Sequence, residues 1–334
     1  MRPDVLRQPL MATLLLFAVL FFLFAYRSYV FPYPEELSAS SATPIEAFLI
    51  YLSGRYGILS LVAYIFLIFA NGISVSRILS RHMVLSSRSY LPMIFYLVAS
   101  CGLWIGKTSI PAALSSFLLL RGTEYFILSF IRKTSFDHTF RGSLLIGLIP
   151  LIFPSSAIYL LAIPLGMFVF RRSARETTAA LIAGLLPLFT YAYTMWALDY
   201  GFIEPLAAIW HEAASIPAGL TLGLEDPIDI MRTVVAGITV ILLLLGLFSF
   251  MITSNTMRTR SRTIFIYFIL LLIIGVFQLL LPGMDVSALI IIAVPVSAII
   301  PAFFSHFPGW ISGSAYVAYL LSVMLLNAYP LLMA

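Results

Sequence analysis

The chain is built from long apolar segments, each about as long as a helix needs to be to cross a lipid bilayer. The first four lie at 10–26, 56–72, 89–106 and 112–131. A transmembrane helix takes about 20 predominantly apolar residues to span a hydrocarbon core of about 30 Å. Because lipid offers no hydrogen-bonding partner to a backbone N–H or C=O group, such segments fold as helices. The sequence therefore predicts an all-α, polytopic transmembrane helical bundle.

Further segments of this kind follow, and one stretch between them has two interpretations. The later segments are 177–198, 231–253, 263–281, 286–304 and 311–333. Residues 142–170 are also apolar but contain the turn-forming sequence Pro154-Ser155-Ser156, so they form one kinked span or a hairpin of two short helices. A hairpin keeps the arginines at its two ends on one side of the membrane, so we favour it and count about 11 spans. Whether the hairpin crosses fully or re-enters is left open.

The composition excludes a soluble domain. Apolar residues make up 61% of the 334 residues and charged residues 10%, whereas about a quarter of a soluble domain is charged. Cys101 is the single cysteine, so no internal disulfide can form.

Positive charge is concentrated in alternate loops. If the N-terminus is cytoplasmic, fourteen of the 19 basic residues lie in cytoplasmic loops, Arg77 and Arg81 among them, and ten of the 14 acidic residues lie in outer loops. An excess of Arg and Lys in cytoplasmic loops sets the orientation of membrane proteins. We therefore expect one integral membrane domain over 1–334 in a bacterial inner membrane, with a cytoplasmic N-terminus and a periplasmic C-terminus. The net charge of +5 then indicates orientation, and we expect no nucleic-acid partner.

Two outer loops, 27–55 and 199–230, are long enough to contain structure of their own. In the first, Thr43 can cap a helix, Pro44 suits the first helical position and Glu46 can close a capping box. We expect a juxtamembrane helix that begins at Pro44 and ends near Gly54.

The second outer loop contains an amphipathic helix by the same reasoning. It begins at Glu204-Pro205, and Leu206, Trp210 and Ala213 share one face. An apolar face of this kind favours a position in the membrane interface.

Two opposite charges lie in the middle of the segment 112–131. Each bare charge costs about 2.5 to 3.5 kcal/mol on insertion scales, so both must face protein or water. Arg121 and Glu124 are three residues apart and can pair on one helix face. Two interpretations stay open: the pair neutralises itself and fastens helices together, or it contacts a substrate headgroup or a proton, as in a transporter or flippase.

A second candidate site follows the first span. Glu35 and Glu36 are adjacent carboxylates beside aromatic residues. Carboxylates at this depth can act as a general base, or can stabilise the positive charge on a sugar as its lipid phosphate leaves. The alternative is a solvated acidic loop.

Three other polar residues are candidates for contacts with substrate. Arg55 and Arg232 each begin a span on the outer face, where a guanidinium can bind a lipid diphosphate or simply snorkel to the interface. His211 lies in the second outer loop with nearby acidic residues, but the spacing matches no metal-binding loop, so we predict no metal site there. The sequence does not identify a cofactor.

Several spaced motifs lie between Asn71 and Pro187. They are Asn71, Leu85-Ser86-Ser87-Arg88-Ser89-Tyr90, Ser135-Phe136-Asp137, 142–153, 172–176 and Gly184-Leu185-Leu186-Pro187. This pattern resembles an uncharacterised family of multi-pass inner-membrane proteins from Bacteroidota. The resemblance implies a localisation and no reaction.

The order of a first span, carboxylates and a capped juxtamembrane helix is also similar to C-type glycosyltransferases, although this chain has no long outer domain. That resemblance implies a polyprenyl-phosphate-linked sugar as substrate, catalysis at the outer face, and Glu35 or Glu36 as the base. We therefore expect a protein that acts on cell-envelope lipids or glycans, with membrane lipids as partners. The alternatives are a transporter or flippase that uses Arg121 and Glu124, or a non-catalytic membrane subunit.

Overall fold

The computed structural model describes residues 10–30, 43–82, 89–102, 109–132, 136–215, 227–280, 286–307 and 309–333, and these residues form helices without a single strand. The all-α prediction is confirmed for this part of the chain. The elements, in order, are α1 (Leu10–Val30), α2 (Pro44–Arg55), α3 (Gly57–Arg81), α4 (Leu91–Leu97), the π-helical η2 (Val98–Gly102), α5 (Ile110–Arg132), α6 (Phe136–Gly147), α7 (Ile149–Ile152), the 3₁₀-helical η3 (Pro154–Leu161), α8 (Ala162–Val169), α9 (Ala174–Ala197), α10 (Glu204–Ser215), α11 (Pro227–Thr253), α12 (Thr259–Leu280), the 3₁₀-helical η4 (Val286–Ala288), α13 (Leu289–His306) and α14 (Gly309–Met333).

Six of the described helices are long and apolar enough to cross a membrane by length and composition. They lie within α3, α5, α9, α11, α12 and α14 and have 20 to 24 residues each. Four apolar helices are shorter, among them α13 and the continuous run of α4 and η2. The chain therefore has the helices of a multi-pass membrane protein, and the figure of about 11 spans stays a prediction.

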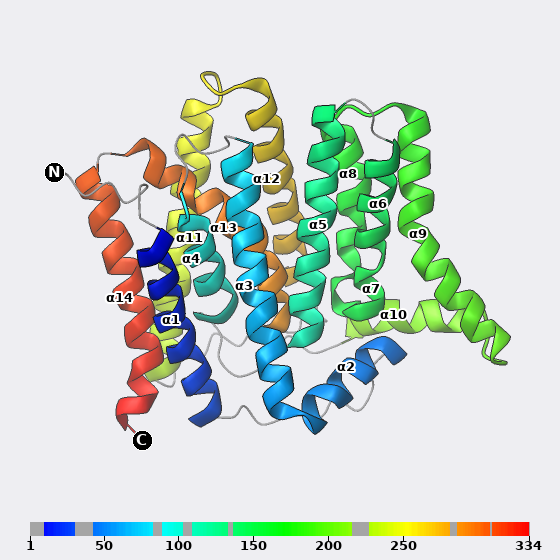
Figure 1. The fold of residues 1–334 in the computed structure, drawn as a ribbon, viewed down its shortest axis with the longest axis horizontal. Helices are drawn as coiled ribbons and strands as arrows, with labels where there is room; N and C mark the ends of the chain where they lie inside the picture. Colours follow the sequence, from blue (N-terminus) through cyan, green and yellow to red (C-terminus); the bar gives the residue numbers. More distant parts are fainter. Residues whose placement is uncertain are drawn as a thin grey trace.

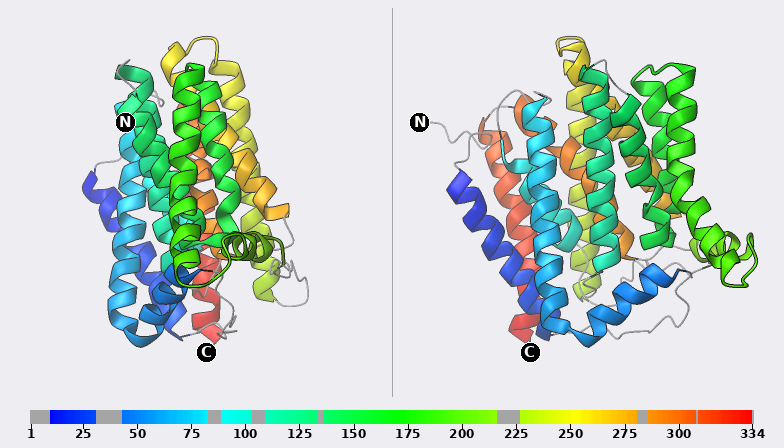
Figure 2. Two further views of the ribbon diagram at one scale, coloured as in Figure 1. Left: turned by 90° about the vertical axis from the view of Figure 1, so that its right-hand side faces the viewer. Right: turned by 45° about the vertical axis from the view of Figure 1, so that its right-hand side comes forward.

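The long helices lie side by side, and their connections gather at two ends (Figure 1). One end, here named the arginine-rich end, holds the C-terminal ends of α3 and α5, the start of α6, the α8–α9 connection and the α11–α12 turn. The short helices α2 and α10 lie across the opposite end, and the side views show the same separation (Figure 2). The start of α1 lies toward the arginine-rich end and the end of α14 lies at the opposite end.

Helix α13 forms the centre of the bundle because it is apolar on every side. It packs against α11, α12, α4 and α5, and nearly all of its side chains from Ile290 to Phe304 are buried. A helix that is hydrophobic all round is stable only when other helices or lipid surround it. The buried ring of Phe95 packs against Phe304, which ties α4 to α13.

The hairpin region reverses direction at Pro154, so that α6 and α8 run side by side (Figure 1). Close backbone contacts hold it in place. A Cβ atom added to Gly147 would lie 2.1 Å from the carbonyl oxygen of Gly184 in α9. A Cβ atom at Gly122 of α5 would meet Ile146 of α6 at 2.7 Å. Small residues allow such close helix packing where lipid supplies no hydrophobic drive between helices.

Both helices expected in the outer loops are present at the end opposite the arginine-rich end. Helix α2 begins at Pro44, and the Thr43 hydroxyl accepts from the Glu46 N–H at 3.3 Å and donates to the Leu151 carbonyl at 2.7 Å. Helix α10 begins at Glu204, but the residues expected to share one apolar face differ in their exposure. Ile209 and Ala213 are buried against the protein, whereas Trp210 is 67% exposed.

Candidate functional site

The candidate site is a group of three charged residues on α3 and α5, which we name the charge cluster: Arg77, Arg121 and Glu124. Arg121 Nη1 donates to Glu124 Oε2 at 2.8 Å, the pairing that a three-residue spacing allows. Arg77 Nη2 donates to both carboxylate oxygens of Glu124, at 2.8 and 2.9 Å. One carboxylate therefore bridges two guanidinium groups from two helices.

The position of Arg77 corrects its assignment to a cytoplasmic loop. Residues 73–81 continue α3, so Arg77 lies one turn before the end of the helix, with its side chain directed at α5. A single sequence contains no sign of this contact, because Arg77 and Glu124 are 47 residues apart, with α4 and η2 between their helices.

The charge cluster lies inside the helical layer, below the loops. At about 1.5 Å per residue, Glu124 is about 12 Å along α5 from its last residue, Arg132. A charged residue at such depth in a membrane helix is costly unless it is paired or faces a polar cavity. The Glu124 side chain is 11% exposed, while those of Arg121 and Arg77 are 36% and 47% exposed. The carboxylate is thus covered and the guanidinium groups reach the surface.

A cavity opens beside the charge cluster. It has a volume of about 380 Å³ and is lined by Arg121, Glu124, Tyr125, Leu128 and Leu145. Four of these residues belong to α5, and Leu145 belongs to α6. The volume is in the range of small-molecule sites, and the lining combines the charged groups of Arg121 and Glu124 with the apolar side chains of Leu128 and Leu145. The pair predicted at Arg121 and Glu124 therefore borders open space and is not sealed among apolar helices.

Aromatic rings hold the polar groups of this wall. The Arg121 guanidinium lies 5.2 Å from the centroid of the Phe117 ring, one turn earlier in α5. The Tyr125 ring stacks on His138 of α6, with centroids 6.0 Å apart. A cation over an aromatic face is attracted by the ring quadrupole, so Phe117 restrains the arginine without using its N–H donors.

A buried polar network fixes α3 against α5 deeper in the bundle. Asn71 Nδ2 donates to the Tyr96 hydroxyl and to the Ala113 carbonyl, both at 3.0 Å, and the Tyr96 and Ser116 hydroxyls are 2.9 Å apart. The side chains of this network are fully buried. Asn71 lies six residues before Arg77 on α3, so the network sets the register in which Arg77 reaches Glu124. An Asn within an apolar run is the only sign of it in the sequence.

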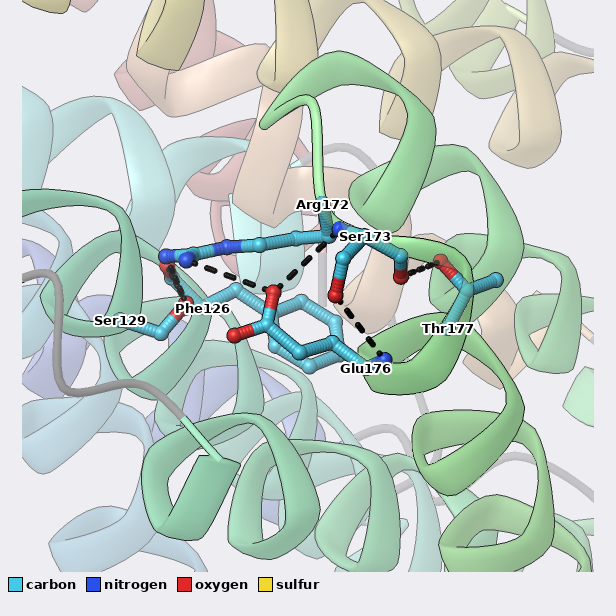
Figure 3. A network of polar contacts seen from close by, with 6 residues as sticks. All are labelled: Phe126, Ser129, Arg172, Ser173, Glu176 and Thr177. Carbon is cyan, nitrogen blue, oxygen red and sulfur yellow. Dashed lines mark hydrogen bonds and ion pairs between the residues drawn. The ribbon is translucent and has the colours of Figure 1, made fainter.

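A second arginine site lies on another face of α5, and we name it the Arg172 site: Ser129, Arg172 and Glu176 (Figure 3). Arg172 Nη2 donates to the Ser129 hydroxyl at 2.9 Å, and Arg172 Nη1 is 3.7 Å from Glu176 Oε2. The Arg172 side chain is only 10% exposed. Ser173 and Glu176 form a capping box at the start of α9. The contact holds the α8–α9 turn onto α5.

The backbone that presents Arg172 is strained at one residue. Arg171 has φ of 51°, in the left-handed region, and the Arg172 N–H donates to the Met167 carbonyl at 3.0 Å. This is the hydrogen bond of a Schellman motif, in which the left-handed position is usually glycine. The motif ends α8 and directs the next side chain back toward the bundle.

The other predicted site residues are not brought together with the charge cluster. Glu35 and Glu36 lie outside the described residues, so their role as a base stays a prediction. Arg55 is at the end of α2, where its Nη1 donates to the Tyr51 hydroxyl and its guanidinium lies 5.9 Å from the Tyr51 and Tyr56 ring centroids. It is roughly 30 Å along α3 from Arg77.

His211 and Arg232 also lie away from the cluster, toward the end that carries α2 and α10. His211 is exposed on α10, and Arg232 is half-buried near the start of α11. Among the described residues no group of His, Cys, Asp and Glu is arranged to hold a metal ion.

His82 is a titratable residue that directly follows α3, at the arginine-rich end of the bundle. Burial lowers the pKa of His82 below its usual value, and the neighbouring Arg81 lowers the pKa further, while Glu124 acts in the opposite direction. The imidazole is therefore neutral at pH 7 and adds no charge to the cluster.

Comparisons of the chain with protein-family models, with curated proteins and with solved structures find no match. The function is therefore argued from the site.

Proposed function

We propose that this protein is a multi-pass protein of the bacterial inner membrane that binds the anionic headgroup of a lipid in the cavity beside the charge cluster, and that it belongs to the transporter or flippase class. The observation that carries the proposal is one buried carboxylate, Glu124, which lines a cavity together with Arg121 and also accepts from the partly exposed Arg77. Guanidinium groups match the geometry of phosphate oxygens.

The proposed topology keeps about 11 spans. It takes the six long apolar helices, the four shorter ones, and α6 with α7 as the remaining crossing. The arginine-rich end would face the cytoplasm, in agreement with the positive-inside rule. A headgroup bound at the charge cluster would then enter from the cytoplasmic leaflet.

Lipid binding can be measured on the full chain. The double variant Arg77→Gln/Arg121→Gln should lose at least about tenfold in affinity for a phosphate-bearing lipid, because the donors for the headgroup are removed. Native mass spectrometry of the protein purified in mild detergent with added phosphatidylglycerol measures this. Arg141→Gln is the matched control, since Arg141 is an exposed arginine that pairs with Asp137. Equal lipid binding by the double variant and the control would contradict the proposal.

Glycosyl transfer from a polyprenyl-phosphate sugar remains a separate proposal that rests on Glu35 and Glu36. Glu35→Gln or Glu36→Gln should then abolish product without lowering the amount of protein in the membrane. Product formation by both variants would remove these residues from the mechanism.

A further inference from the structure

The charge cluster carries one more positive charge than negative charge. Glu124 is the carboxylate that pairs with Arg77 and Arg121, and neither arginine pairs with a second carboxylate within the part of the chain that the structure describes. His82 is neutral at pH 7 for the reasons given above. Arg141 of α6 already pairs with Asp137. The charge cluster thus has a net charge of +1, and Arg121 and Glu124 are its members that line the cavity.

We propose that Glu124 sets the charge of the ligand: with its carboxylate in place, the cluster accepts a headgroup with one negative charge, a phosphodiester, in preference to a phosphomonoester with two. This inference rests on the proposed function, because it deepens the account of the same cavity. A monoanion brings the cluster to neutrality. A dianion leaves a negative charge uncompensated next to the buried carboxylate.

The arginines can take a ligand while they keep Glu124. A guanidinium has more N–H donors than these contacts use, since Arg77 reaches Glu124 through Nη2 alone and Arg121 through Nη1 alone. The side chains are 47% and 36% exposed, so the remaining donors are accessible. The ligand is therefore added as a further acceptor, and the ion pairs persist.

Exchange of Glu124 for the ligand is disfavoured by burial. The Glu124 side chain is 11% exposed, and removing both partners of a buried carboxylate leaves an uncompensated charge. With Glu124 retained, a second negative charge on the ligand would lie within a few ångströms of the carboxylate, in surroundings where charges interact far more strongly than in water. Glu124 is thus the residue that distinguishes one ligand charge from two.

The rest of the cavity favours a ligand with an acyl chain. Leu128 and Leu145 line it together with the ring of Tyr125. A lipid that covers these side chains gains from apolar burial, which a small phosphodiester in solution cannot do. The shared chemistry is the phosphodiester group, and the experiment separates the lipid from the free anion.

The test compares two lipids that differ in charge and little in size. Phosphatidylmethanol is a diester with one negative charge, and phosphatidic acid of the same acyl chains is a monoester that approaches two charges at pH 8. Affinities for the full-length wild-type protein in detergent are measured by native mass spectrometry, with dimethyl phosphate as the diester that lacks a tail. We expect phosphatidylmethanol to bind at least about tenfold tighter than phosphatidic acid, and tighter than dimethyl phosphate. Equal affinity for the two lipids, or tighter binding of phosphatidic acid, overturns the inference, and dimethyl phosphate binding as well as the lipid overturns the assignment to a lipid.

Glu124→Gln tests the residue itself. It raises the net charge of the cluster to +2 and keeps the shape of the side chain, so the preference for the monoanion should disappear and phosphatidic acid should bind about tenfold tighter than it does to the wild type. Glu176→Gln is the control, because Glu176 pairs with an arginine outside the cavity. An unchanged preference in Glu124→Gln contradicts the inference alone. Lipid binding that is unaffected by Arg77→Gln/Arg121→Gln contradicts the proposed function as well.

Discussion

Helix α5 contributes to two arginine–glutamate sites that use similar groups in different ways. In the charge cluster, Arg77 and Arg121 are partly exposed and Glu124 borders a cavity. In the Arg172 site, the arginine is 10% exposed and its donors meet Ser129 and Glu176. Glu124 and Ser129 are five residues apart, so they face different sides of the helix.

The difference shows what distinguishes the proposed binding site from a structural contact in a membrane bundle. The Arg172 site balances one arginine with one glutamate, and the arginine side chain is only 10% exposed, so it offers little to a ligand. The charge cluster has two arginines for one glutamate and keeps N–H groups at the surface. Charge balance and access, more than the presence of intramembrane arginine, therefore point to function.

The largest expected effect is on stability at the Arg172 site. Arg172→Ala removes a nearly buried side chain and its bond to Ser129, and it releases the α8–α9 turn from α5. We expect a loss of about 2 to 3 kcal/mol in the free energy of unfolding, with lipid affinity unchanged. Thermal unfolding in detergent, followed by circular dichroism, measures the stability, and native mass spectrometry measures the lipid affinity. If the Arg172→Ala variant is as stable as the wild type but fails to bind lipid, the roles of the two sites are the reverse of those described.

The opposite pattern is expected for Arg77→Gln. The side chain is 47% exposed and Glu124 keeps Arg121 as partner, so the free energy of unfolding should change by less than about 1 kcal/mol. Lipid affinity should fall about tenfold, because one of the two donors for the headgroup is lost. If the melting temperature falls as far as in Arg172→Ala while affinity is retained, the charge cluster is a structural contact.

The two sites should also be energetically independent. They share no hydrogen-bonding partner, so the effects of Arg77→Gln and Arg172→Ala on unfolding should add within about 0.5 kcal/mol. The free energies of unfolding of the wild type, both single variants and the double variant, measured under one condition, form a double-mutant cycle that tests this. A coupling above about 1 kcal/mol would mean that α5 transmits changes between its two faces.

The smallest effect concerns pH. Burial and Arg81 hold the pKa of His82 below the value in the unfolded chain, about 6.5, so the unfolded state takes up the proton first as the pH falls. The contribution of His82 to the free energy of unfolding is therefore fully present above about pH 6.5 and declines below it. The decline is small because His82 is only half-buried. His82→Gln should flatten the dependence of the melting temperature on pH between about 5 and 7. If the melting temperature depends on pH equally in the variant and the wild type, another group causes that dependence.

Much of the fold follows from the sequence because membrane helices are local structures. Apolar segments predicted at 231–253 and 311–333 match the C-terminal ends of α11 and α14 at Thr253 and Met333, and α2 begins at Pro44 as the capping residues indicate. The segment predicted at 89–106 is less regular: its described part comprises α4 and a π-helical turn and ends at Gly102. Nothing in an apolar run indicates where its hydrogen bonding changes from one helix type to another.

The site was predictable only in part. Arg121 and Glu124 are visible because charges in an apolar segment require partners, and their spacing places them on one helix face. Arg77 was missed because it lies close to a helix end among loop arginines, and its partner is on another helix. Contacts between distant helices depend on packing, here on the Asn71 network and on glycines such as Gly122, which single-sequence reasoning does not reach.

The central claim is that the charge cluster holds an anionic headgroup while Glu124 keeps both arginines. An experimental structure of the full chain in nanodiscs that contain phosphatidylglycerol tests it most directly. We predict phosphate density within hydrogen-bonding distance of the Arg77 and Arg121 guanidinium groups, about 2.7 to 3.2 Å, with the Glu124 pairs intact. A cavity filled only by acyl chains, or closed by α6 over the arginines, would contradict the account.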